Sequence, residues 1–225
     1  PCGTLFPYTT LFRSPLGALG CLATLSFHET KNLTCGEGGA LLVNDESLVE
    51  RAEIIREKGT NRRKFFRGEV DKYTWVDLGS SYVISDVLAA FLCAQLEARD
   101  AIQDKRRRIW DRYHDELAAW AEPLGIRLPH VPAHCDQAYH MFYMVMPTQE
   151  MRAAVGAWLR ERSILAVFHY QPLHLSEMGR GFGGRPSACP VTEEVSGLII
   201  RLPFYNVMTD EEQRDVIEAL LAFRP

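Results

Sequence analysis

Two apolar runs near the start of the chain predict neighbouring β-strands. Residues 22–27 are mostly apolar, and residues 40–43 form a second run directly after a cluster of glycines. A short apolar run bounded by glycines is typical of a buried strand. Asn44 or Asp45 can then cap a helix that ends at Gly59. The apolar face of this helix consists of Leu48, Ala52 and Ile55.

The clearest helical pattern begins at Ser85 or Asp86, either of which can cap it, and continues to about Trp120. Its apolar positions are Val87, Ala90, Phe91, Ala94 and Ala98. Pro123 and Gly125 then end the helix, and a helix of this length often connects two domains. Before it, residues 60–73 are polar, basic and aromatic without a period, which predicts a functional or mobile loop.

Strands and helices alternate in the C-terminal part of the chain. Strands are predicted at residues 126–128, 139–146, 164–170 and 199–202, short helices at 149–159 and 191–198, and a glycine-rich loop at 179–190. Thr148 can cap the helix whose inner face is Met151, Val155 and Leu159. Thr209 and Glu212 have the spacing of a capping box that opens a last helix. Strands interleaved with helices predict an α/β fold.

Composition is that of an ordinary globular protein, with 47% hydrophobic and 24% charged residues. A net charge of −4 gives no reason to expect a nucleic acid or an anionic membrane as partner. The basic cluster at residues 105–108 lies in a helical pattern, so we interpret it as a solvated face. The six cysteines include no C-x-x-C pair, which argues against zinc and a disulfide framework and favours reduced thiols in a cytoplasmic protein.

Lys31 is the candidate for chemistry. It follows the first apolar run, with a hydroxyl at Ser26 and glycines at Gly36, Gly38 and Gly39. A lysine in this setting can be an imine-forming amine, with a hydroxyl nearby for a phosphate. The alternative is a surface lysine before a glycine-rich turn, and spacing alone does not choose between them. Gly38 and Gly39 precede a strand and no helix, so we expect a tight turn there and no phosphate cradle.

The string S-F-H-E-T-K-N followed by G-E-G-G-A resembles the cofactor-lysine segment of the DegT-type sugar-nucleotide aminotransferases, which use pyridoxal phosphate (PLP). The resemblance covers residues 15–224 and is strongest to dTDP-4-dehydro-6-deoxyglucose 4-aminotransferases. It implies the C-terminal part of a fold-type I aminotransferase, with Lys31 bound to PLP as an imine and moving the substrate proton. Ser26 would bind the cofactor phosphate, the alternative being a serine that faces solvent.

Gly79-Ser80-Ser81-Tyr82 resembles the family segment that reaches a phosphate across a dimer interface. Many members have asparagine at the position of Ser81 and arginine at that of Val83. The Ser81 hydroxyl would still donate a hydrogen bond to the phosphate, but from a shorter side chain. The resemblance therefore implies a homodimer with shared sites. The alternative for Ser81 is an N-terminal cap of the long helix.

Residues implied to contact substrate lie further along the chain. His169, Tyr170 and His174 resemble part of the wall of the sugar-nucleotide site, the alternative being structural histidines at a strand end. Arg62 lies in a segment similar to the substrate-proximal one of the dTDP-sugar subgroup, and arginine suits a diphosphate. His28, Glu29 and His140 add no recognisable metal-ligand spacing to these histidines, so no metal is predicted.

The resemblance divides the chain into three parts. Residues 1–14 match nothing in the family and resemble a translated adapter peptide, residues 15–120 are a remnant of the large PLP-binding domain, and residues 121–225 are a small C-terminal domain. The implied reaction moves an amino group from glutamate to C4 of dTDP-4-dehydro-6-deoxy-D-glucose, giving dTDP-4-amino-4,6-dideoxy-D-galactose for cell-surface polysaccharide. The residue that pairs with the pyridine nitrogen of PLP in this family is expected upstream of this chain. Two alternatives therefore stay open: a fragment without activity and a sugar-nucleotide binding module.

Overall fold

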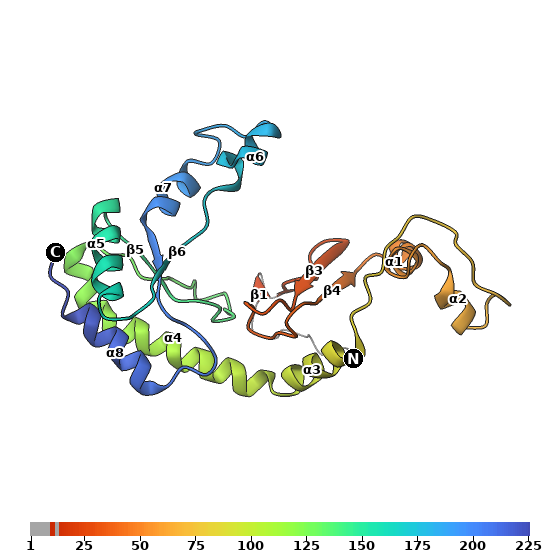
Figure 1. The fold of residues 1–225 in the computed structure, drawn as a ribbon, viewed down its shortest axis with the longest axis horizontal. Helices are drawn as coiled ribbons and strands as arrows, with labels where there is room; N and C mark the ends of the chain where they lie inside the picture. The colour runs from red at the N-terminus through yellow and green to blue at the C-terminus, as the bar shows by residue number, and fades with distance from the viewer. Residues whose placement is uncertain (1–9, 12–13) are drawn as a thin grey trace. The chain divides into compact units, whose positions relative to one another are not determined.

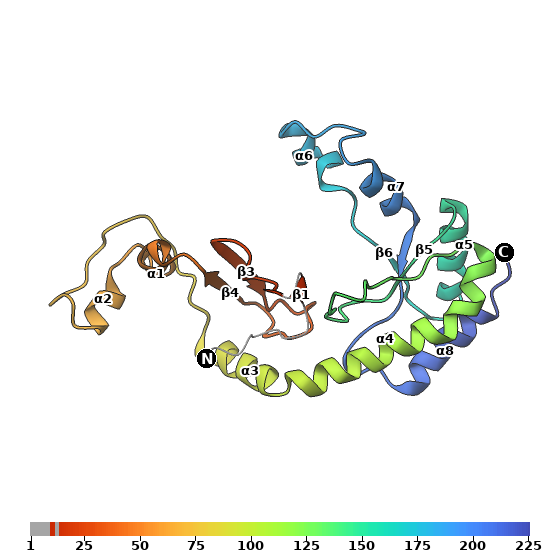
Figure 2. The same ribbon diagram turned by 180° about the vertical axis from the view of Figure 1, so that it is seen from behind.

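The fold, given by a computed structural model that describes residues 10–11 and 14–225, separates into two compact units. Unit 1 runs to Ala101 and includes Pro132–Ala138, and unit 2 consists of Ile102–Val131 and Tyr139–Pro225. We describe each unit by itself (Figures 1 and 2). The assignment of residues 15–120 and 121–225 to a large-domain remnant and a small domain stays a prediction.

Unit 1 is built on a β-hairpin followed by helices (Figure 1). Its elements are β1 (Thr10–Leu11), β2 (Ser14–Pro15), β3 (Leu22–Ser26), β4 (Gly39–Val43), the 3₁₀ turn η1 (Glu46–Leu48), α1 (Val49–Arg56), α2 (Arg62–Phe66) and α3 (Asp86–Glu97). β3 and β4 pair antiparallel from Leu22 opposite Val43 to Ser26 opposite Gly39. Both strands were predicted, but their apolar residues are not buried: Leu22 is 49% and Leu41 50% exposed.

Two polar side chains begin the helices of unit 1 as the sequence predicted. The Asp45 carboxylate accepts a hydrogen bond from the Ser47 amide, and the Ser85 hydroxyl accepts one from the Leu88 amide. The single long helix that was predicted is wrong, because α3 ends at Glu97 and a second helix begins at Arg99.

The predicted loop at residues 60–73 contains the short helix α2, so that prediction is wrong in part. The helix is a little more than one turn long, which is too short to show a hydrophobic period in the sequence. Gly68, with φ +74°, lies in the left-handed region soon after the helix ends.

Unit 2 has a three-stranded antiparallel sheet in the order β5-β7-β6 (Figure 1). Its elements are α4 (Arg99–Ala121, whose first three residues belong to unit 1), η2 (Glu122–Leu124), β5 (Tyr143–Val145), α5 (Gln149–Arg160), β6 (Val167–Phe168), η3 (Leu173–Leu175), α6 (Glu177–Gly181), α7 (Pro190–Leu198), β7 (Ile199–Arg201) and α8 (Asp210–Leu221). Residues 126–128 contribute only an isolated bridge from Arg127 to Val145. The glycine-rich loop predicted at 179–190 instead begins inside α6, whose first turn is capped by Ser176.

The core of unit 2 lies between the sheet and helices α4, α5 and α8. Figures 1 and 2 both show α8 lying along α4. Fully buried side chains come from each layer: Tyr113, Leu117, Phe142, Met144, Val155, Leu159, Ile217 and Leu220. Thr148 caps α5, and Thr209 and Glu212 form both hydrogen bonds of the predicted capping box, so the ends of these helices are confirmed.

The basic cluster at residues 105–108 is not a uniform solvated face, and that prediction is wrong for one residue. Arg106 is only 5% exposed, whereas Arg107 and Arg108 are exposed. Arg106 shares the inner face of α4 with Ile109 and Trp110, since residues three and four apart lie on one side of a helix.

Candidate functional site

Lys31 lies in the loop that connects β3 to β4. Beyond the last strand pair, the hairpin continues through hydrogen bonds from the Phe27 amide to the Gly38 carbonyl and from the Glu29 amide to the Gly36 carbonyl, each 2.8 Å. The Lys31 amide then donates to the His28 carbonyl at 2.9 Å, which closes a turn at the tip. The backbone around Lys31 is therefore fixed by ladder and turn hydrogen bonds.

The side chain of Lys31 is exposed, and within the described part of the chain its amine forms no ion pair or hydrogen bond. Ser26, the last residue of β3, is exposed as well, and its hydroxyl accepts a hydrogen bond from the His28 amide at 3.4 Å. A fixed backbone thus presents an amine and a hydroxyl from one hairpin. An amine and a hydroxyl are the groups that can bind the aldehyde and the phosphate of PLP, and these roles of Lys31 and Ser26 stay predictions.

A tight turn was predicted at Gly38 and Gly39, but neither of these glycines has a left-handed backbone. The left-handed position is Gly36, with φ +83°. A Cβ on Gly38 would lie 2.5 Å from the Cys35 sulfur, and one on Gly39 would lie 2.9 Å from the Leu25 carbonyl oxygen. These two glycines allow close approach within the hairpin.

Ser81 lies in an extended segment against the end of α1. It forms an isolated bridge with Glu57, and the neighbouring Ser80 amide donates to the Ile55 carbonyl at 3.0 Å. Ser81 is exposed, and α3 is capped by Ser85. The alternative in which Ser81 caps the helix is therefore wrong, while its phosphate role stays a prediction.

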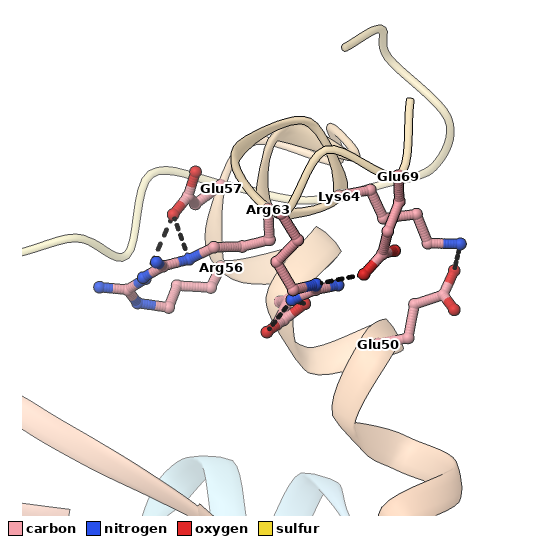
Figure 3. Close-up of polar contacts among 8 residues, drawn as sticks. Glu50, Arg56, Glu57, Arg63, Lys64 and Glu69 are labelled. Carbon is pink, nitrogen blue, oxygen red and sulfur yellow. Dashed lines mark hydrogen bonds and ion pairs between the residues drawn. The ribbon is translucent and has the colours of Figure 1, made fainter. Parts of the chain in front are cut away.

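Arg62 belongs to an ionic network between α1 and α2, part of which Figure 3 shows. Glu57, whose side chain is only 11% exposed, lies 3.2 Å from Arg63 and 3.3 Å from Arg56 through Oε1. Its Oε2 atom lies 3.9 Å from Arg62 and is buried without a hydrogen bond among the described residues. One carboxylate thus faces three guanidinium groups, which leaves positive charge for an anionic ligand.

The remainder of this network holds α2 to α1. Lys64 pairs with Glu50 at 2.6 Å, and Arg67 pairs with Glu53 at 2.9 Å and with Glu69 at 2.6 Å (Figure 3). These pairs are partly exposed, so each contributes little to stability by itself. Together they define the position of the segment that carries Arg62.

His169 and Tyr170 follow β6 in unit 2, and their rings lie 5.4 Å apart. Burial, together with the charge of Arg201, lowers the pKa of His169. His174 in η3 is bound elsewhere: its Nε2 atom lies 2.9 Å from a Glu193 carboxylate oxygen. That hydrogen bond lowers the pKa of Glu193. Sequence reasoning named the two histidines and missed Glu193, which lies nineteen residues from its partner.

Residues 10–11 and 14–225 contain neither a metal-ligand cluster nor a candidate membrane span. Histidine, cysteine, aspartate and glutamate side chains there do not gather in threes as a metal site requires. In the same residues, no helix has the length and apolar character needed to span a membrane.

The chain matches the DegT/DnrJ/EryC1/StrS aminotransferase family over residues 8–221. It is 28% identical to the spore coat polysaccharide biosynthesis protein SpsC of Bacillus subtilis, over 95% of this chain and 56% of that protein. The fold matches the aminotransferase TlmJ from Streptoalloteichus hindustanus, with a TM-score of 0.81, 26% identity, and coverage of 95% of this chain and 55% of TlmJ.

A putative sugar aminotransferase from Streptococcus pneumoniae, solved in its PLP form, shares the fold with a TM-score of 0.79 at 22% identity, over 94% of this chain and 54% of that one. The chain thus spans about half the length of these relatives, and the predicted α/β aminotransferase fold is confirmed for that portion. The match along nearly the whole chain identifies it as a member of the DegT/DnrJ/EryC1/StrS aminotransferase family.

Proposed function

We propose that this chain carries the lysine half of a PLP-dependent sugar-nucleotide aminotransferase site. The observation that supports the proposal is Lys31, an exposed amine without an acidic partner among the described residues, on a hydrogen-bonded hairpin tip. Lys31 would hold the cofactor through its amine, and the Ser26 hydroxyl would donate to the cofactor phosphate, as would Ser81 of a second copy. PLP supplies the electron sink of the reaction when it is bound.

The chemistry left to the protein is proton transfer and orientation. An amine at the Lys31 position can remove the proton from Cα of glutamate and later deliver a proton to C4 of the sugar. Only the neutral form of the amine can accept this proton. Arg62 would contact the diphosphate, since its end of the network has more guanidinium groups than carboxylates.

The full reaction that we propose transfers the amino group of glutamate to C4 of dTDP-4-dehydro-6-deoxy-D-glucose, in a cytoplasmic homodimer. The product would be dTDP-4-amino-4,6-dideoxy-D-galactose. His169, Tyr170 and His174 would contribute to the wall of the sugar site. Incubation with each candidate keto sugar and amino donor, followed by mass spectrometry of the product, tests the substrate. Analytical ultracentrifugation tests the dimer.

The decisive experiment asks whether Lys31 reacts with PLP. Purified chain is mixed with PLP, its visible absorption is recorded, and the sample is reduced with borohydride and digested. We expect a band at the blue edge of the visible, and one modified peptide that contains Lys31. K31A should lose both signals, whereas K72A, which removes an exposed lysine of the same unit, should keep them.

Modification spread evenly over exposed lysines would contradict the proposal, because it would indicate an unselective amine reaction. Absence of the band would favour one of the alternatives. Nucleotide-sugar binding without the band would indicate a binding module, and the absence of both would indicate an inactive fragment.

A further inference from the structure

Arg201 lies at the end of the central strand of the unit 2 sheet. In the register of the sheet it is opposite Tyr143 on β5 and Val167 on β6. Its chain neighbours Ile200 and Leu202 belong to the core cluster, so Arg201 points to the other face of the sheet. His169 follows Val167 by two residues, so the register continues past Phe168 opposite Ile200 and brings His169 level with Ile199, diagonal to Arg201. The charge of Arg201 still reaches the His169 ring.

Two nitrogen atoms of these residues are enclosed without hydrogen-bond partners among the described residues. Both Nε of Arg201 and Nδ1 of His169 are buried and lack a hydrogen bond among the described residues. Arg201 also forms no ion pair in that part of the chain, and its guanidinium instead lies 5.7 Å from the ring centroid of Tyr170. A buried donor that stays unpaired is costly, so native proteins usually provide a partner for it.

The missing partner has a defined chemistry. A guanidinium group presents a planar fork of donors that matches the two oxygens of a carboxylate or a phosphate. The neutral imidazole of His169 can add a donor or acceptor at Nδ1 without repelling an arginine. The Tyr170 ring beside the guanidinium is 71% exposed, so a ligand that binds Arg201 can also contact this ring.

We propose that Arg201 and His169 form an oxyanion-binding subsite at the end of β7. This proposal rests on the proposed function. The reactants of that function offer two oxyanions, the carboxylate of the amino donor and a phosphate of the nucleotide sugar. The basic charge at Arg62 is a separate feature of unit 1. Nothing in the spacing of residues 199–202 indicated this role for Arg201.

The test is an NMR titration of the ¹⁵N-labelled chain without PLP. The Nε–H resonance of Arg201, assigned by its absence in R201Q, is followed during separate additions of inorganic pyrophosphate and of glutamate. We expect a saturable shift with at least one probe, and roughly tenfold or greater weakening of that probe in R201Q. R201K should fall between the two, since it keeps the charge and loses the fork.

Control variants and paired readouts make the result specific. R160Q removes an exposed arginine of α5 in the same unit and should bind as the unmodified chain does. A response to pyrophosphate alone assigns the subsite to phosphate, and one to glutamate alone assigns it to the donor carboxylate. If neither probe moves the resonance, or if R201Q that keeps its circular dichroism binds equally well, the subsite is refuted. Labelling of Lys31 by PLP is unaffected by that failure, so each proposal can fail separately.

Discussion

Arg106 is a buried cation whose removal should measurably destabilise unit 2. Its side chain is 5% exposed, and among the described residues it forms no ion pair. The guanidinium donates to the carbonyl oxygens of Tyr139 at 2.8 Å and His140 at 2.5 Å, and to Oδ1 of Asn206 at 2.6 Å. Arg106 therefore connects α4 to the segments before β5 and after β7.

The expected magnitude follows from two opposing effects. Burial lowers the pKa of Arg106 to about 10, and this shift corresponds to a cost of roughly 3 kcal/mol for the charged form. Three hydrogen bonds from a charged donor contribute roughly 1.5–3 kcal/mol each. The net stabilisation is therefore roughly 1.5–6 kcal/mol, and we expect R106M to lower the free energy of unfolding by about 3 kcal/mol.

Urea unfolding followed by the fluorescence of Trp110, which is buried on the same helix, measures this change. R108M is the matched control, because Arg108 is exposed on α4, and it should change stability by less than about 0.5 kcal/mol. Amide hydrogen exchange should also become faster at residues 139–142. If R106M lowers the free energy of unfolding no more than R108M does, the three hydrogen bonds do not contribute more free energy than desolvation of the guanidinium costs, and the argument is refuted.

Three further predictions follow from single contacts. T209A removes the capping box of α8 and should cost about 0.5–2 kcal/mol in urea unfolding, whereas T209S should keep most of the stability. G59A places a Cβ 1.8 Å from the Asp77 carbonyl oxygen at φ +75°, so thermal unfolding of unit 1 should occur at lower temperature, and an unchanged transition would contradict this. Burial first, and then Arg201, lower the pKa of His169, so the folded state resists protonation and loses stability as pH falls through about 6.5. NMR titration should show a higher His169 pKa in R201Q, and an unchanged value would exclude the influence of Arg201.

Helix ends in this protein were predictable because their signals are local. Thr148, Thr209 and Ser85 each cap a helix through an amide three residues away, and such spacing can be read from the sequence. The strand predicted at residues 139–146 was too long for a reason that is not local. Tyr139 has φ +47°, and its carbonyl bonds to Arg106, which lies thirty-three residues earlier, so β5 begins only at Tyr143.

The same distinction applies to the candidate site. Lys31 and Ser26 share one hairpin, so a single stretch of sequence indicated both of them. Arg201 and His169 come together only because β6 and β7 pair antiparallel with Val167 opposite Arg201. An arginine within an apolar run of sequence does not by itself indicate a ligand-binding role. The buried Nε of Arg201 and Nδ1 of His169 lack the hydrogen-bond partner that burial normally requires, and this makes Arg201 the residue whose substitution is most informative about what the protein binds.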